Sequence, residues 1–382
     1  MNREIYMDYA ATTYMKPEVI KDMKTYMDEY FGNASSIYHI SRKTRMAIDI
    51  SRKRVADAIN SNIDEIYFTS GGSESDNWAL KGIAFANKDK GKHIITTAIE
   101  HHAVINTCKY LEKLGFEITY LPVNKYGMVD LHNLKKAVRK DTILVSVMFA
   151  NNEIGTIEPV KKIGDFCRHN KIIFHTDAVQ AVGNIPIDVK TMNIDLLSMS
   201  SHKFYGPKGV GALYIRKGIR IDSLIHGGSQ ERGRRAGTYN TPGIVGIGKA
   251  ISIAVKNLEV QKERLTKLRD MFIKELLEIQ DTSLNGSPGK ERLPGNINVT
   301  FKGIEAETLL IMLDSRGIYV SSGSACSAGA LEPSHVLIAI GLTESMAKSS
   351  IRFTIGSGTT YEEIAYVLEV VKECVNKLRN NK

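Results

Sequence analysis

The chain has 382 residues, 43% of them hydrophobic and 24% charged, with a formal net charge of +9. This length suits a large domain with a smaller companion, and the composition is typical of a globular protein. No run approaches the ~20 apolar residues that a membrane-spanning helix needs, so we expect no membrane segment. Acidic residues are interspersed among the basic ones and no nucleic-acid-binding motif accompanies them, so nucleic-acid binding is not expected.

The cysteines indicate a reducing compartment. They lie far apart, at positions 108, 167, 326 and 374, without a CxxC pair. This spacing argues against a disulfide framework or a Cys-rich zinc site, and no bound metal is expected. The first eight residues contain acids and no apolar stretch, so they do not resemble a signal peptide, and we expect a cytoplasmic location.

The first two-thirds of the chain predicts an α/β domain. Two amphipathic helices are expected near the N-terminus, the first opened by Lys16 and Pro17, the second capped by Ser41 and running to about Asn60. Strand-like and helix-like segments then alternate. The predicted strands are 66–69, 93–97, 117–121, 142–149, 172–175, 196–199 and 212–215, and the predicted helices include 74–87, 103–114 and 160–170. Several strands are continuous apolar runs, so we expect a mostly parallel sheet covered on both faces, in a three-layer α/β/α arrangement.

The last third predicts a smaller α+β domain. A long helical stretch is expected over 243–277. It is followed by predicted strands at 296–301, 318–321 and 351–354 and by predicted helices at 305–313, 333–340 and 361–378. We therefore expect a large domain of residues 13–255 and a small domain made of residues 1–12 and 256–382.

Lys203 lies directly after a predicted strand and before a glycine-rich loop, within residues 194–211 (IDLLSMSSHKFYGPKGVG). A lysine held in partly dry surroundings loses its proton more easily than a surface lysine, and its neutral amine can form a Schiff base. Ser200 and His202, just before it, could hold a phosphate. The alternative is a loop lysine that points into water.

Other polar residues follow other predicted strands, where ligands of such sheets bind. Residues 70–76 (SGGSESD) lead into a helix and could cradle a phosphate, although a plain capped turn would look the same. His101 could stack on an aromatic ring, move a proton or be structural. Asn152, in the segment NNEIG, could bind a ring oxygen or a carboxylate or form a turn. Asp177 could pair with a protonated pyridine nitrogen, cap a helix or bind magnesium.

Cys326 lies in a run of small residues, 320–330 (VSSGSACSAGA). A lone cysteine is usually a small core residue. Here the absence of apolar periodicity predicts an exposed thiol on a mobile loop, where it could react.

A single cofactor, pyridoxal phosphate, would use the lysine, the aspartate, the histidines and the phosphate cradle that follow the predicted strands. It needs an amine, an acid for its ring nitrogen, a phosphate cradle and a stacking ring. The chain offers them at Lys203, Asp177, Gly72, Ser73, Ser200, His202 and His101.

These residues resemble those of cysteine desulfurases of the NifS/IscS type, which are fold-type-I pyridoxal-phosphate enzymes of aminotransferase class V. The resemblance runs nearly end to end. It is carried by residues 6–13 (YMDYAATT), 68–77 (FTSGGSESDN), 151–155 (NNEIG), 201–209 (SHKFYGPKG), 231–238 (ERGRRAGT), 321–326 (SSGSAC) and 350–354 (SIRFT).

The resemblance implies a role for each residue at the cofactor. Lys203 would form the Schiff base, and His101 would stack on the ring and move protons. The remaining cofactor contacts would be Asp177 at the pyridinium, Gln180 at the ring hydroxyl, Asn152 beside the ring, and Gly72, Ser73, Ser200 and His202 at the phosphate, joined by Thr238 from the second subunit of a homodimer.

The same resemblance implies the substrate and the partners. L-Cysteine would bind through its carboxylate at Asn33, Asn152 and Arg352, and Cys326 would take its sulfur as a persulfide. The sulfur would pass to an acceptor such as an iron–sulfur scaffold protein, where Cys326 could transiently contact a cluster.

Two other classes of function stay open at this point. Another fold-type-I enzyme, such as an aminotransferase or a selenocysteine lyase, would share the cofactor residues, but an aminotransferase would have no use for Cys326. A non-catalytic subunit that binds acceptor proteins or tRNA would have no use for Lys203.

Overall fold

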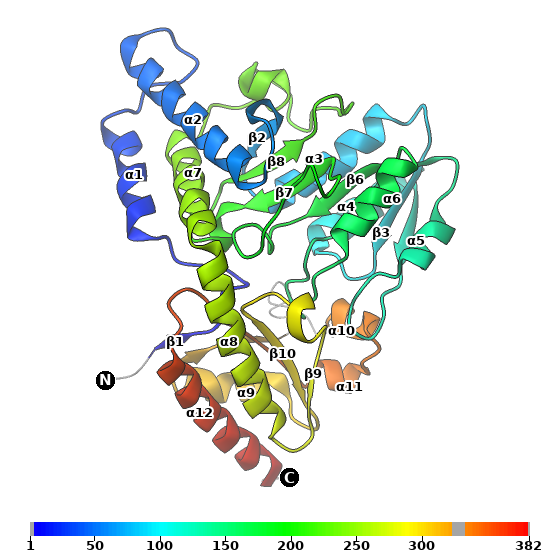
Figure 1. The fold of residues 1–382 in the computed structure, drawn as a ribbon, viewed down its shortest axis with the longest axis vertical. Helices are drawn as coiled ribbons and strands as arrows, with labels where there is room; N and C mark the ends of the chain where they lie inside the picture. Colours follow the sequence, from blue (N-terminus) through cyan, green and yellow to red (C-terminus); the bar gives the residue numbers. More distant parts are fainter. Residues whose placement is uncertain (1–3, 323–332, 381–382) are drawn as a thin grey trace.

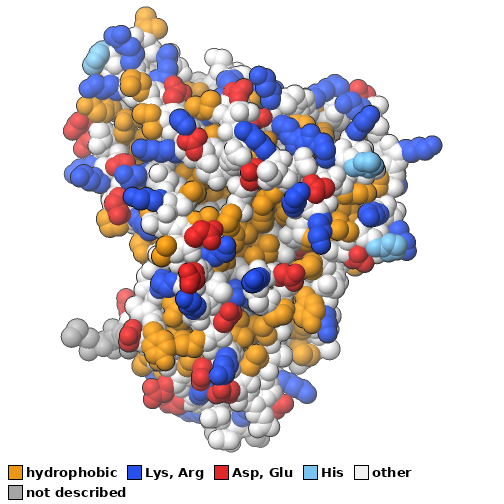
Figure 2. Space-filling model, in the orientation of Figure 1, with side chains coloured by type: hydrophobic (Ala, Val, Ile, Leu, Met, Phe, Trp, Pro, Cys, Tyr) orange, Lys and Arg blue, Asp and Glu red, His pale blue; other side chains and the backbone are white. Residues whose placement is uncertain are grey.

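The computed structural model describes residues 4–322 and 333–380. They form a larger body around a seven-stranded sheet and a smaller body around a four-stranded sheet, which are connected by the long helix α8 (Figure 1). Basic side chains are spread among acidic ones over the face shown in Figure 2.

The larger sheet has the strand order β2-β8-β7-β6-β5-β3-β4. Its strands are β2 (Ile66–Thr69), β3 (His93–Thr97), β4 (Glu117–Leu121), β5 (Thr142–Ser146), β6 (Ile173–Asp177), β7 (Leu196–Ser200) and β8 (Gly211–Ile215). Neighbouring pairs from β4 to β7 are parallel, whereas β8 is antiparallel to both β7 and β2. The predicted, mostly parallel sheet is confirmed.

Helices cover both faces of this sheet, as the continuous apolar strands predict. They are α1 (Pro17–Asp28), α2 (His39–Ala58), α3 (Gly72–Ala86), α4 (His102–Lys113), α5 (Leu131–Ala137), α6 (Val160–His169) and α7 (Thr241–Lys256). Neighbouring residues of β5 pack in different hydrophobic cores. Val145 packs in the core shared by α2, α6 and α7, and Leu144 packs in the core shared by α3 and α4. The three-layer α/β/α arrangement is therefore confirmed.

The smaller body joins the two ends of the chain. Its sheet has the order β12-β13-β10-β9, and residues Ile5 and Tyr6 of β1 pair in parallel with Ile318 and Tyr319 of β11. The elements are β1 (Ile5–Tyr6), α8 (Leu258–Leu277), β9 (Thr282–Leu284), β10 (Asn296–Phe301), α9 (Ala306–Asp314), β11 (Ile318–Tyr319), β12 (Ser321–Ser322), α10 (His335–Ala339), α11 (Glu344–Ala347), β13 (Ser350–Thr354) and α12 (Tyr361–Asn380). The pairing of β1 with β11 and the break between α7 and α8 at Asn257 support the expected domain division, which stays a prediction.

Several predicted details differ from the structure. The helix α2 begins at His39, with Ser41 buried inside it, so Ser41 is not its cap. The helical stretch over 243–277 is two helices, α7 and α8. The strand β5 ends at Ser146 rather than Phe149, although the Phe149 amide still donates to the Asp177 carbonyl. The helices α5 and α11 and the strand β9 are not predicted from the sequence. Within residues 4–322 and 333–380, no helix has the length and hydropathy needed to cross a membrane.

Candidate active site

A cavity of about 380 Å³ opens where the strands of the larger sheet end and the smaller body begins. Most of the predicted site residues line it. They are Gly72, Ser73, His101, Asn152, Asp177, Gln180, Ser200, His202, Lys203 and Arg352. Asn33 and Thr238 are exposed and do not line this cavity, and Cys326 lies outside the described residues.

Lys203 is positioned by a short 3₁₀ turn (Ser201–Lys203) that directly follows β7. Its Nζ donates hydrogen bonds to the carbonyl oxygens of Ala10, at 2.5 Å, and Ala11, at 2.8 Å. A side chain at Gly206 would place Cβ 2.0 Å from Ser201 Oγ, so the loop that follows needs glycine at this position. The sheet and the N-terminal segment together hold the amine at the cavity.

The first turn of α3 forms a cradle beside Lys203. A Cβ at Gly72 would lie 2.7 Å from Val179 Cγ2, so glycine lets the backbone of this turn pack against Val179 without displacing it. Ser200 and His202 line the same region, with Lys208 nearby. Free amides at a helix N-terminus, small side chains and a nearby cation suit a phosphate group.

His202 is a neutral group in this cradle. Burial lowers its pKa to about 4, and the charges of Lys203 and Lys208 act in the same direction. Its Nδ1 lies 3.1 Å from Thr12 Oγ1. The imidazole can therefore take part in hydrogen bonds without adding charge at neutral pH.

Asp177 ends β6 and is buried at the cavity floor. Its Oδ1 accepts a hydrogen bond from the Val179 amide at 2.9 Å. Burial raises the pKa of Asp177, while a protonated His101 and the charge of Lys203 lower it. A buried carboxyl in this position favours a cationic ligand, which would stabilise its ionised form. Gln180, one turn further along, donates from Nε2 to the Ala10 carbonyl at 3.0 Å.

His101 caps the N-terminus of α4. Its Nδ1 accepts a hydrogen bond from the Ala103 amide at 3.1 Å. In the neutral ring this contact assigns the proton to Nε2. Burial is the main cause that lowers the pKa of His101, so the neutral form is favoured near pH 7. The site thus holds an imidazole with a fixed tautomer.

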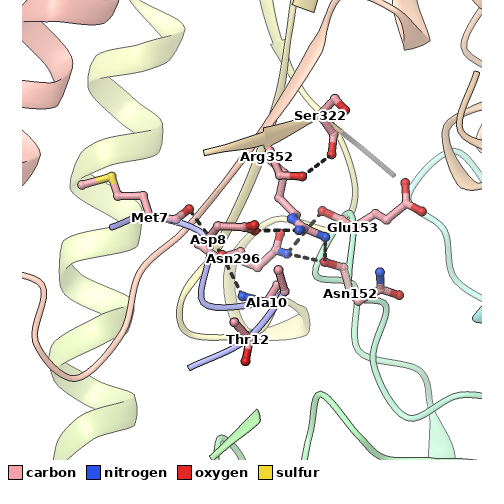
Figure 3. Close-up of polar contacts among 12 residues, drawn as sticks. Met7, Asp8, Ala10, Thr12, Asn152, Glu153, Asn296, Ser322 and Arg352 are labelled. Atoms are coloured by element: carbon pink, nitrogen blue, oxygen red, sulfur yellow. Dashed lines mark hydrogen bonds and ion pairs between the residues drawn. The ribbon is translucent and has the colours of Figure 1, made fainter. Parts of the chain in front are cut away.

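Arg352 reaches the cavity from β13 of the smaller body (Figure 3). Only 1% of its surface is exposed. Its Nη2 lies 2.7 Å from Asp8 Oδ1, and its Nη1 donates to the Asn152 carbonyl at 3.2 Å. Its Nε has no hydrogen-bond partner among the described residues. The guanidinium is therefore held from two sides and keeps donor capacity for an anion.

Three buried acids in the cavity lining, Asp76, Glu100 and Glu153, received no predicted role. Burial raises the pKa of Glu100 to about 8 and that of Glu153 to about 7. Glu153 accepts a hydrogen bond from Ser334 Oγ at 2.5 Å. Glu100 lies next to His101 and Glu153 lies next to Asn152, and both pairs come directly after predicted strands. This position is the sequence signal that could have identified the two glutamates.

The chain matches known proteins over nearly its whole length. The family description "Aminotransferase class-V" matches residues 5–367. The protein named "Cysteine desulfurase IscS" of Methanosarcina thermophila is 59% identical over 379 residues, covering 99% of this chain and 94% of that protein. The protein of the same name from Clostridium botulinum strain Hall is 57% identical over 381 residues, covering 99% and 96%.

Solved structures agree with these matches. A "NIFS-LIKE PROTEIN" superposes with a TM-score of 0.93 at 39% identity, covering 98% of this chain and 100% of that one. The structure titled "SspA in complex with cysteine" superposes with a TM-score of 0.82, also at 39% identity, covering 92% and 98%.

The fold is that of the fold-type-I pyridoxal-phosphate-dependent enzymes. The chain belongs to the class V aminotransferase family and, within it, to the cysteine desulfurases of the IscS type.

Proposed function

We propose that the protein removes sulfur from L-cysteine, leaving L-alanine and a persulfide on Cys326, with pyridoxal phosphate as its cofactor. One observation supports this most strongly: Lys203, Asp177 and Arg352 come from three different elements and line a single cavity. The names of the close relatives and the cysteine in a similar structure support the same reaction.

The cavity has the groups that pyridoxal phosphate requires. The N-terminus of α3 at Gly72 and Ser73 suits its phosphate, and the buried Asp177 suits its cationic ring nitrogen. When bound, the cofactor supplies an electron sink that makes the Cα proton of an attached amino acid acidic. The contacts we assign to it are Lys203, Asp177, Gln180, His101, Asn152, Gly72, Ser73, Ser200 and His202.

The protein's own groups perform the proton transfers and the substrate positioning. With the cofactor bound, the amine of Lys203 would remove the Cα proton of the substrate. The fork of Arg352 binds the substrate carboxylate, with Asn152 beside it, and the carboxylate then competes with Asp8 for the guanidinium. Asn33 is exposed and does not line the cavity within one chain, so its assigned contact stays a prediction of the family resemblance.

Cys326 then accepts the sulfur. Its thiolate attacks the sulfur of L-cysteine, so that an S–S bond forms as the Cβ–S bond breaks. The electron pair of the broken bond stays on the alanine carbon, where a proton completes the methyl group. His101, with its proton on Nε2, is suited to move protons between these positions.

The partners belong to the same proposal. We infer a homodimer in which Thr238 of the second subunit completes the phosphate cradle, since Thr238 is exposed within one chain. The persulfide passes to an acceptor protein such as an iron–sulfur scaffold, with Cys326 in transient contact with the cluster, and the enzyme works in the cytoplasm.

The experiment is to record the absorption of the pyridoxal-phosphate-loaded protein during addition of L-cysteine, with alanine and sulfide assayed in the same samples. We expect the absorption band to shift and the two products to appear in equal amounts in the presence of a thiol reductant. A shifted band with pyruvate or an amino-transfer product would retain the cofactor and reject the reaction.

A further inference from the structure

Asp76 is a second acid beneath the predicted cofactor site. It lies on α3, one turn beyond the phosphate cradle, with 1% of its surface exposed, and it lines the cavity. One ligand atom each from Asp76, His101 and Asp177 lies within 4.8 Å of those of the other two. The floor of the cavity therefore contains two adjacent buried carboxyl groups.

Asp76 lacks a cationic partner that would stabilise its ionised form. Its Oδ1 has no hydrogen-bond partner among the described residues. His175 Nε2 lies 3.7 Å from Asp76 Oδ1, and the two ring nitrogens of His175 contact Ser146 and Ser198. Burial lowers the pKa of His175 to about 3, so this ring is neutral and offers no positive charge.

The surroundings of the two acids differ. Burial and the charges of Asp177 and Glu100 raise the pKa of Asp76 well above its usual range, although a hydrogen bond with the Ser198 side chain acts in the opposite direction. Asp177 instead has the positive charge of Lys203 nearby, which lowers its pKa, whereas His101 lies near both acids and lowers the pKa of Asp177 only when its own ring is protonated. Two neighbouring carboxyls in a dry site cannot both ionise without a large cost, and the negative charge is favoured on Asp177.

We propose that Asp76 is a positioning residue that acts through Asp177: the pair holds one proton at neutral pH, and Asp76 keeps it when Asp177 binds the cationic ring. This inference rests on the assignment of Asp177 in the proposed function. A protonated Asp76 adds no second charge beneath the ring, and Asp177 remains the single anion that fixes the ring's protonation.

The test uses the cofactor-free protein, so that it does not depend on catalysis. Asp76→Asn keeps the shape of the side chain and cannot ionise. An acid whose pKa is raised by folding stabilises the protein at low pH. This stabilisation falls as the pH rises from the pKa of the acid in the unfolded protein towards its pKa in the folded protein. One retained proton makes the unfolding equilibrium constant rise tenfold per pH unit.

Denaturant unfolding of the wild-type protein and of D76N is measured between pH 5.5 and 8, with exposed Asp49→Asn as the matched control. We expect the unfolding equilibrium constant of the wild type to rise more steeply with pH than that of D76N, by about one additional factor of ten per pH unit, because D76N lacks the retained proton. The pH dependence of D49N should match that of the wild type. A slope of D76N equal to that of the wild type would overturn the proposal. If D76N does not fold, Asp76→Ala is measured in the same way.

A second readout separates this proposal from the proposed function. Wild-type and D76N proteins are titrated with pyridoxal phosphate while cofactor absorption is followed from pH 6 to 9. We expect D76N to bind it with the absorption of the wild type at pH 7, since a neutral amide replaces a neutral acid. Absence of binding by the wild type would contradict the cofactor assignment and leave the unfolding result to stand alone. Loss of the band in D76N alone would show that Asp76 acts as an anion, against the proposal.

Discussion

The two walls of the cavity are built in different ways. The strand-end wall, made of Gly72, Asp177, Ser200 and Lys203, lies at or just after the ends of strands β2, β6 and β7 of one sheet. The domain-contact wall, made of Asn152 and Arg352, depends on the salt bridge of Arg352 with Asp8 and on its hydrogen bond to the Asn152 carbonyl, which join segments far apart in the sequence. The first wall is fixed by strand register, and the second requires the two bodies to meet correctly. We therefore expect substitutions in the first wall to affect the cofactor and substitutions in the second to affect the substrate.

The largest effect is expected at Lys203. Replacing Lys203 by Ala removes the amine that takes the Cα proton, and loss of such a group typically costs about 10²–10⁴-fold in rate. The measurement is alanine formation from L-cysteine. The exposed Lys217→Ala variant, which keeps the wild-type site, is the control. A K203A rate within a few-fold of the wild type would remove the lysine from the mechanism.

Asp177→Asn tests the strand-end wall at the cofactor. A charge-assisted hydrogen bond contributes about 1.5–3 kcal/mol, so cofactor affinity should fall about ten- to a hundredfold. Affinity is measured by absorption titration of the cofactor-free protein, with the exposed Asp89→Asn as control. Unchanged affinity in D177N would mean that another group pairs with the ring.

Arg352→Lys tests the domain-contact wall. Lysine keeps the charge and loses the planar fork, so we expect KM for L-cysteine to rise about tenfold while cofactor affinity stays unchanged. Arg220→Lys, at an exposed pair with Asp89, serves as control. If R352K weakened the cofactor as D177N does, the proposed separation between the two walls would be wrong.

The smallest effect is expected at Ser334, which connects the domain-contact wall to α10. Its hydroxyl donates to Glu153 and accepts from the Leu337 amide as the helix cap. Ser334→Ala should lower the free energy of unfolding by about 1–2 kcal/mol, since it removes a cap and leaves a buried acid with one hydrogen bond fewer. Denaturant unfolding measures it, and Ser345→Ala, exposed on α11, should change stability by less than about 0.5 kcal/mol. Equal stabilities of the two variants would show that the Glu153 contact contributes nothing.

The sequence predicts the strand-end wall because the carboxyl ends of parallel strands meet at one edge of a sheet. His101, Asp177 and Lys203 each follow a strand that the apolar pattern identifies, and their proximity follows from that pattern. The contact of Arg352 with Asp8 has no such local signal, because it joins residues 344 positions apart, and Arg352 was expected at the site only from a family resemblance.

Asp76 shows a different limit of sequence interpretation. An acid near the start of a predicted helix is the usual pattern of a favourable helix terminus, so its sequence gives no sign of burial. Only the packing of α3 on the sheet brings it beside Asp177. Glu153 follows a predicted strand, which indicates a position near the site, but its neighbours in the segment NNEIG suggest a turn and do not predict that its side chain is buried against Ser334.

The most direct test of the central claim is to find the sulfur on the protein. The loaded enzyme is incubated with L-cysteine without a reductant, digested and analysed by mass spectrometry for cysteine peptides heavier by one sulfur atom. The account predicts the added sulfur on Cys326 and none on Cys108, Cys167 or Cys374, whose burial raises their pKa values. Cys326→Ala should then bind L-cysteine without forming alanine. Alanine formation at the wild-type rate in C326A, or added sulfur on a buried cysteine instead, would contradict it.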